Sequence, residues 1–95
     1  MKPPVVKTIT TRNYNGTAGG NLTIRAIDDF RVTKVFVEIY SAAGGLLEQG
    51  NAVMNLNTVD WTYTATQANP LLAGSKIKAT ATDVPGNEGL FEITL

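Results

Sequence analysis

Residues 35–40 read VFVEIY, and this stretch decides the fold class because aliphatic residues occupy every second position. Successive side chains of an extended strand point to opposite faces, so the pattern places three aliphatic side chains on one face: Val35, Val37 and Ile39. The opposite face carries a mixed set: Phe36, Glu38 and Tyr40. The pattern therefore predicts a strand that buries one face in a hydrophobic core.

The same two-residue period recurs in five other segments, which read NLTIRAID (21–28), WTYTAT (61–66), KIKATAT (76–82), LFEITL (90–95) and, less regularly, VVKTIT (5–10). At the two ends of the chain, the expected inward residues are Val5 with Ile9, and Phe91 with Ile93 and Leu95. The best helical candidate, QANPLLAG, is limited to about one turn by its proline and glycine. Six or seven short strands with one apolar face each must pack against a second sheet, which predicts an all-β sandwich or a small barrel.

Composition and charge narrow the classes of function. Ninety-five residues make one domain, and eight basic side chains balance eight acidic ones. A neutral domain lacks the electrostatic footprint of a nucleic-acid binder, and no apolar run approaches the length of about 20 residues that a bilayer requires. We therefore expect no nucleic-acid partner and no direct membrane insertion.

The chain contains neither cysteine nor histidine. These absences exclude a disulfide framework, a zinc-thiolate site, a thiol nucleophile and a Ser-His-Asp triad within this chain. A pair of carboxylates of the glycosidase kind is the one catalytic arrangement left to consider, and a small sandwich rarely offers the cleft it needs. The prediction is that the protein is not an enzyme.

Three motifs carry a resemblance to a known family: LLAGSKIKATATDVPGNEG (71–89), LTIRAIDDFRVTKVFVEI (22–39) and WTYTAT (61–66). The first resembles the end of bacterial immunoglobulin-like repeats, the second their second and third strands with an aspartate-containing corner, and the third their Trp-x-Tyr strand. The resemblance implies an immunoglobulin-like sandwich of about seven antiparallel strands with Greek-key connections over residues 5–95. Residues 1–4 are then a linker, or the artificial start of a domain cut from a longer chain.

The sequence differs from antibody domains in two features, and both favour the bacterial branch of the family. The cysteine pair of antibody domains is missing, and Trp61 lies in a later strand than the antibody tryptophan. Fibronectin type III domains share the architecture but not the turn pattern. The resemblance implies a non-catalytic spacer, protein-interaction or adhesion module of an exported bacterial protein, located extracellularly, at the cell surface or in the periplasm. Its expected partners are neighbouring domains or another surface protein.

The segment TATDVPGNEG, residues 80–89, raises the question of a ligand site. An aspartate before Pro-Gly can accept hydrogen bonds from the turn behind it, which accounts for Asp83 and Asn87 structurally. The alternative is calcium, because the corner with Asp28 and Asp29 is expected at the same end of the sandwich and would add hard oxygen ligands. The turn is the preferred interpretation, so no cofactor is expected.

The mixed face of residues 36–40 raises a second question. Phe36 and Tyr40 are expected to face solvent with Glu38 between them, and two exposed aromatic rings on one strand require a cover. The stems of Lys34, Lys76 and Lys78, a neighbouring domain or a stacked glycan ring are the three covers considered. A ligand-binding module, either calcium-stabilised or carbohydrate-binding, is therefore the alternative function.

Overall fold

The alternating segments form strands in the computed structural model, which describes residues 3–27, 31–57, 59–70 and 72–95. In these parts of the chain the strands are β1 (Val5–Thr10), β2 (Asn21–Ile27), β3 (Val32–Tyr40), β4 (Leu46–Asn51), β5 (Val53–Met54), β6 (Asp60–Thr64), β7 (Lys76–Asp83) and β8 (Glu88–Thr94). The same parts contain no helix, not even the single turn that the sequence allowed in residues 67–74.

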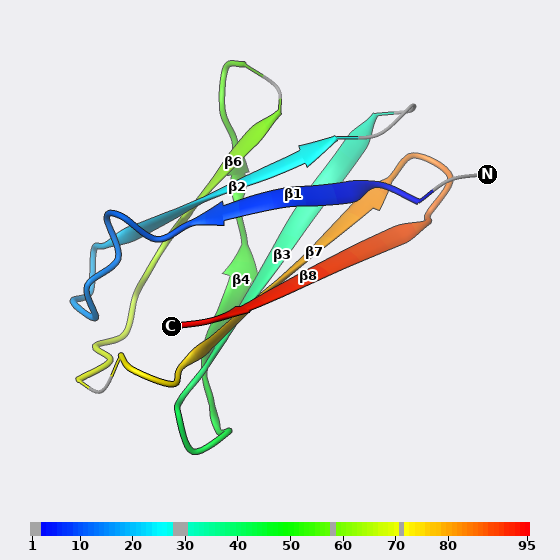
Figure 1. The fold of residues 1–95 in the computed structure, drawn as a ribbon. Helices are drawn as coiled ribbons and strands as arrows, with labels where there is room; N and C mark the ends of the chain where they lie inside the picture. Colours follow the sequence, from blue (N-terminus) through cyan, green and yellow to red (C-terminus); the bar gives the residue numbers. More distant parts are fainter. Residues whose placement is uncertain (1–2, 28–30, 58, 71) are drawn as a thin grey trace.

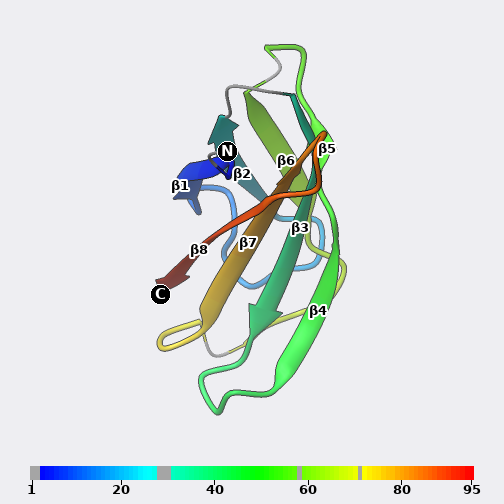
Figure 2. The ribbon, with the colours of Figure 1, turned by 90° about the vertical axis from the view of Figure 1, so that its right-hand side faces the viewer.

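The strands form two four-stranded antiparallel sheets, with strand orders β1-β2-β6-β5 and β4-β3-β7-β8. The chain passes between the sheets after β2, β4 and β6, and the two layers face each other across the core (Figures 1 and 2). This order corresponds to the ABED and CFG sheets of immunoglobulin-like sandwiches, with β4 added beside β3. The all-β, antiparallel sandwich predicted from the sequence is confirmed. The eighth strand is the two-residue β5.

The core lies between the sheets and contains the residues on which the fold prediction depends. Val35, Val37 and Ile39 are fully buried, and Trp61 and Tyr63 are also buried. The remaining members come from both sheets and from the loops beside them: Val6, Tyr14, Leu22, Ile24, Ala26, Val32, Ala52, Ala65, Ile77, Ala79 and Ala81. Burial of these apolar side chains is the main stabilising contribution to the fold.

The expectation for the first strand is wrong at one residue. Val6 is buried, whereas the side chain of Val5 is 48% exposed. The pairing of β1 with β2 shifts register between Val6 and Thr8, and this irregularity brings Ile9 back to the core side. A β-bulge inserts one residue into the alternation, so a strict two-residue period assigned Val5 and Ile9 to one face incorrectly.

The last strand also departs from expectation. Phe91 pairs with the buried Ala79, which places it toward the core, but it is 39% exposed. The reason is that β8 is an edge strand of its sheet, with a neighbour on one side only. Ile93 and Leu95 pack partly against the core, as the sequence predicted.

The chain starts and finishes toward opposite ends of the sandwich, and the molecule measures 40 × 26 × 17 Å. In Figures 1 and 2 the C-terminus stops short of the turn that follows β3. At the end that we call the N-terminal end, the carbonyl of Pro4 lies so close to Gly89 that any Cβ there would collide with it. At the opposite, C-terminal end, the Leu95 amide donates to the Ser75 carbonyl over 2.8 Å, and the Gly74 amide donates to the Leu95 carbonyl. The strand β8 runs between these two points.

Candidate functional site

The outer face of the β4-β3-β7-β8 sheet is the candidate functional site. Because Val35, Val37 and Ile39 point into the core, the alternate residues of β3 point outward: Phe36, Glu38 and Tyr40. All three outward side chains are half-buried. The structure thus brings together the residues that the sequence predicted for this face.

A row of charged side chains crosses the middle of this face. Glu38 pairs in register with Lys78 of β7, and Lys78 pairs with Glu92 of β8. The Lys78 Nζ lies 4.0 Å from the Glu38 Oε1, and the Tyr40 hydroxyl donates to the Glu38 Oε2 over 2.7 Å. This hydrogen bond raises the pKa of Tyr40 above its ordinary value of 10.0. The phenol is therefore held as a donor and is not free to act as a base.

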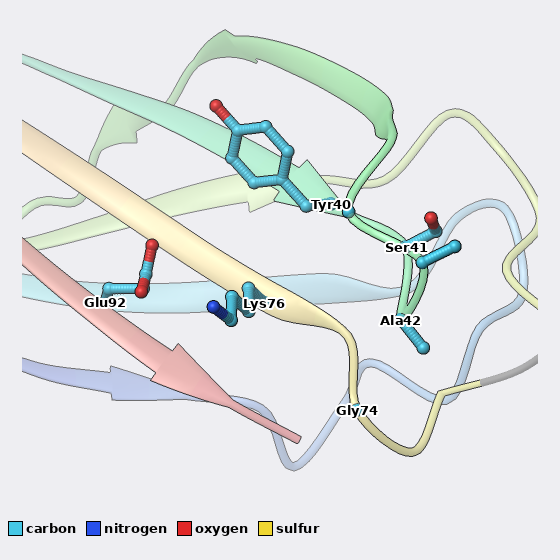
Figure 3. A pocket seen from close by; sticks show the side chains of 8 residues that line it. Tyr40, Ser41, Ala42, Gly74, Lys76 and Glu92 are labelled. Carbon is cyan, nitrogen blue, oxygen red and sulfur yellow. The ribbon is translucent and has the colours of Figure 1, made fainter.

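One hollow lies at the C-terminal side of the charged row and has a volume of about 310 Å³. Tyr40, Lys76 and Glu92 line it from three neighbouring strands, and the turn of residues 41–44 and Gly74 complete its wall (Figure 3). The lining offers an aromatic ring, an ammonium group and a carboxylate. Such groups can hold a polar ligand by stacking and hydrogen bonds.

A second hollow of about 390 Å³ lies on the other side of the charged row. Phe36 shares it with the lysines Lys34 and Lys78, and with further residues of β7 and β8: Thr80, Thr82, Glu88 and Leu90. The lysine stems thus lie near the exposed ring, in the arrangement expected for partial shielding. Leu90 remains largely exposed beside them, so the shielding leaves apolar surface in contact with water.

The turn after β7 is closed by its own aspartate. Asp83 is only 2% exposed, its Oδ1 accepts from the Asn87 amide over 2.7 Å, and its Oδ2 accepts from the Asn87 side chain over 3.4 Å. The Gly86 amide donates to the Asp83 carbonyl, and Gly86 has a φ of 92°, a backbone conformation that favours glycine. These bonds are the ones expected of a structural turn.

The structure describes only two of the four residues considered as calcium ligands. Asp28 and Asp29 lie outside the described residues, while Asp83 and Asn87 occupy the turn as expected. Among the described residues, no group of three or more Asp, Glu, His or Cys side chains is arranged to hold a metal ion. Calcium binding at this end of the molecule stays the alternative to a structural turn.

Sequence reasoning missed a buried carboxylate on β4. Glu48 is 8% exposed, and its Oε1 accepts from the Tyr63 hydroxyl over 2.7 Å, the Thr66 amide over 2.9 Å and the Thr66 hydroxyl over 3.1 Å. Its Oε2 accepts from the Gln67 amide over 3.1 Å. Burial alone would raise the pKa of Glu48, but these bonds outweigh it and hold the pKa below the ordinary 4.5.

The signal for Glu48 was present but incomplete in the sequence. A buried tyrosine needs a partner for its hydroxyl, so Tyr63 required an acceptor somewhere near the edge of the core. Identifying that acceptor requires the register of β3 with β4, in which Glu48 lies opposite Ile39. The role of Glu48 is structural, because it fastens residues 66–67 to the strand β4.

Comparison with known proteins shows a structural likeness but no sequence relative. No protein-family model matches the chain, and no curated protein matches its sequence. Among solved structures, it is similar to the crystal structure of a tetra-tandem repeat in the extending region of a large adhesion protein, with a TM-score of 0.66 and 21% identity. The match covers 97% of this chain and 24% of the other, so the chain spans about a quarter of that structure's length. At this identity the likeness shows the fold alone.

The described residues contain no helix that is long and apolar enough to cross a membrane.

Proposed function

We propose that this domain is a non-catalytic immunoglobulin-like module that acts as a spacer or adhesion unit in a longer bacterial protein, secreted or held at the cell surface. The observation that carries the proposal is that the two chain ends lie toward opposite ends of a sandwich 40 Å long. Modules joined through such ends extend a chain along one axis instead of folding it back. The structural likeness to a tandem repeat of an adhesion protein supports the same reading.

The construction of both ends supports a spacer. Hydrogen bonds fix the chain through Leu95, and the buried Pro4 packs beside Gly89 at the other end. Order therefore extends almost to both ends of the chain, which limits the freedom of a neighbouring module. We take residues 5–95 as the domain and residues 1–4 as the link to a preceding module, with Pro4 fixing the point at which that link enters the sandwich.

The absence of histidine and cysteine from the sequence supports a non-catalytic role. The hydroxyl of Tyr40 is bonded to Glu38, and the carboxylate of Glu48 is bonded by the backbone and side chains around it. These carboxylates serve the fold, and each is held by partners within the same domain.

The spacer function is tested by joining copies of the chain directly and measuring their length. Proteins of one, two and four copies are compared by small-angle X-ray scattering. The expected result is a maximum dimension that grows by about the length of the long axis, 40 Å, with each copy. The matched control has a flexible Gly-Ser linker of about 15 residues at each junction, which broadens the distance distribution. A four-copy protein as compact as the control would contradict the proposal.

The second candidate function is ligand binding at the outer face, which the two hollows beside Phe36 and Tyr40 favour. A glycan ring stacked on an exposed aromatic side chain is the ligand of the carbohydrate-binding alternative. A glycan array tests it, with Tyr40→Ala as the control for specific recognition. Binding that is absent, or equal in the two proteins, would remove this alternative.

The calcium alternative is tested separately by thermal unfolding in a chelator and in millimolar calcium. A ligand that binds only the folded state raises the unfolding midpoint. Equal midpoints would leave the acidic end of the molecule without a metal, and the turn of Asp83 as purely structural.

A further inference from the structure

We propose that consecutive copies of this module dock end to end, with Leu56 of one copy inserted into an apolar hollow of the preceding copy. This inference rests on the proposed function, because it requires modules in tandem. It adds the contact that fixes one module against the next.

The inserting element is the hairpin between β5 and β6, which projects from the N-terminal end (Figure 2). Leu56 at its tip is fully exposed, and Val53 and Met54 on the same hairpin are also exposed. A group of large apolar side chains in water on a projecting segment is a feature of interaction sites.

Hydrogen bonds hold the described residues of this hairpin on both sides of Leu56. The Asn55 amide donates to the Asp60 carbonyl over 2.7 Å. The Asn57 Oδ1 accepts from the amides of Val59 and Asp60, and the Asn57 Nδ2 donates to the Asp60 carboxylate. The residues that flank Leu56 are thus already held by bonds within the domain, which reduces the conformational entropy that is lost when Leu56 binds a partner.

The receiving element is a hollow of about 240 Å³ at the C-terminal end. The described residues that line it are uncharged: Ser41, Ala42, Ala43, Leu47, Asn69 and Pro70. The side-chain Nδ2 of Asn69 donates to the Ser75 and Tyr14 hydroxyls, so this polar group is already bonded within the domain. An aliphatic side chain can therefore enter the hollow without leaving a charge buried and unpaired.

The hairpin of one copy can reach the hollow of the preceding copy because the C-terminus lies beside that hollow. The Gly74 amide donates a backbone hydrogen bond to the Leu95 carbonyl, and Gly74 lies against Ala42 at the C-terminal end. The next copy therefore begins beside the hollow, and its own N-terminal end carries the hairpin. A projection and a hollow at opposite ends of one chain form a heterologous, head-to-tail contact. The covalent link gives it a high effective concentration.

The test uses a protein of two joined copies in which only the first copy carries ¹⁵N, prepared by segmental ligation. The amide signals of Ala42, Ala43 and Leu47 report on the hollow. We expect these signals to differ between the single copy and the joined pair. Leu56→Asp in the second copy should return them to the single-copy positions, with a docked population at least tenfold smaller, as loss of one buried leucine predicts.

The matched control carries the same Leu56→Asp substitution in the first copy, where the hairpin faces no preceding module. It has the same composition, and the signals of the hollow should stay as in the unsubstituted pair. Ala43→Glu in the first copy, placed at the receiving side, should abolish docking, and in the second copy it should not. Both residues are exposed, so the substitutions leave the fold intact.

Identical hollow signals in the single copy and the joined pair would overturn the docking proposal. Scattering by the same proteins keeps the two proposals separate. An array that lengthens with each copy but shows no docking signals retains the spacer function and loses the contact. An array that does not lengthen contradicts the spacer function itself.

Discussion

Two buried carboxylates close loops at opposite ends of this sandwich, and they differ in how far away their partners lie. Asp83 is bonded by Asn87, four residues along the chain, at the N-terminal end. Glu48 is bonded by Tyr63, Thr66 and Gln67, between 15 and 19 residues along the chain, near the C-terminal end. The difference is between a local turn and a link between separate segments of the fold.

This comparison explains why one carboxylate was predicted and the other was not. A turn built by Asp, Pro, Gly and Asn within five positions can be predicted from the sequence, because its hydrogen bonds join residues that are close along the chain. A carboxylate in the middle of LLEQGN shows nothing of its partners until the strand register is known. The comparison also predicts that the long-range link contributes more to stability, because its loss leaves more donors without an acceptor, and the buried Tyr63 hydroxyl is among them.

The largest effect is expected for Glu48→Ala. The substitution leaves the buried Tyr63 hydroxyl and the Thr66 and Gln67 amides without their acceptor, at a cost of about 3 kcal/mol in the free energy of unfolding. Glu48→Gln keeps one oxygen for the Oε1 bonds and should lose about half as much. Urea unfolding of the three proteins measures both values. A loss below about 1 kcal/mol for Glu48→Ala would contradict the larger stabilising role given to Glu48 than to Asp83.

A smaller effect is expected from acidification, which removes only the charge-dependent part of the same link. The pKa of Glu48 is lowered in the folded state, so its contribution is complete above the ordinary value of 4.5 and is lost as the pH falls through the folded pKa. The difference in stability between the native protein and Glu48→Gln should therefore shrink as the pH falls below 4.5. The pKa of Asp60 is also lowered, but its contribution is common to both proteins and cancels.

The next effect in size is expected for Asp83→Ala, with a loss of about 1 to 2 kcal/mol. The Asn87 amide loses its 2.7 Å bond, but the backbone bonds of the turn remain. Asn87→Ala removes only the weak 3.4 Å bond and should change stability by less. The same urea titrations rank these variants with those of Glu48. If Asp83→Ala were more damaging than Glu48→Ala, local bonds would outweigh the long-range link.

The smallest effect is expected for Arg25→Ala, which tests a carboxylate that is bonded across strands but near the surface. Arg25 pairs with Asp60 in register and bonds it at 2.9 Å and 3.2 Å, yet its own side chain is half exposed. Solvent screens such a pair, so the unfolding midpoint should change less than for Asp83→Ala. A larger change would mean that the number of bonds, and not burial, ranks these carboxylates.

The fold was predictable because alternation is a local property of each strand. Val35, Val37 and Ile39 face the core as predicted, while the β-bulge moved the inward position from Val5 to Val6. A bulge depends on the pairing with β2, which no single segment reveals.

The candidate site was predictable only in part. Phe36, Glu38 and Tyr40 share one face because their spacing on β3 requires it. The two hollows beside them depend on residues from β7 and β8 and on the turn of residues 41–44, which the fold brings together. The exposed Leu56 needed the hairpin geometry before its position at the tip could be seen.

The close approach of Pro4 to Gly89 has a mechanical consequence. The strands β1 and β8 begin side by side but belong to different sheets. A force on the two chain ends therefore acts on the first residue of β1 and on the last residue of β8, at opposite ends of two parallel strands. Hydrogen bonds of antiparallel strands run across the strand direction. Tension along the molecule therefore shears the β1–β2 and β7–β8 bonds all together instead of unzipping them one by one.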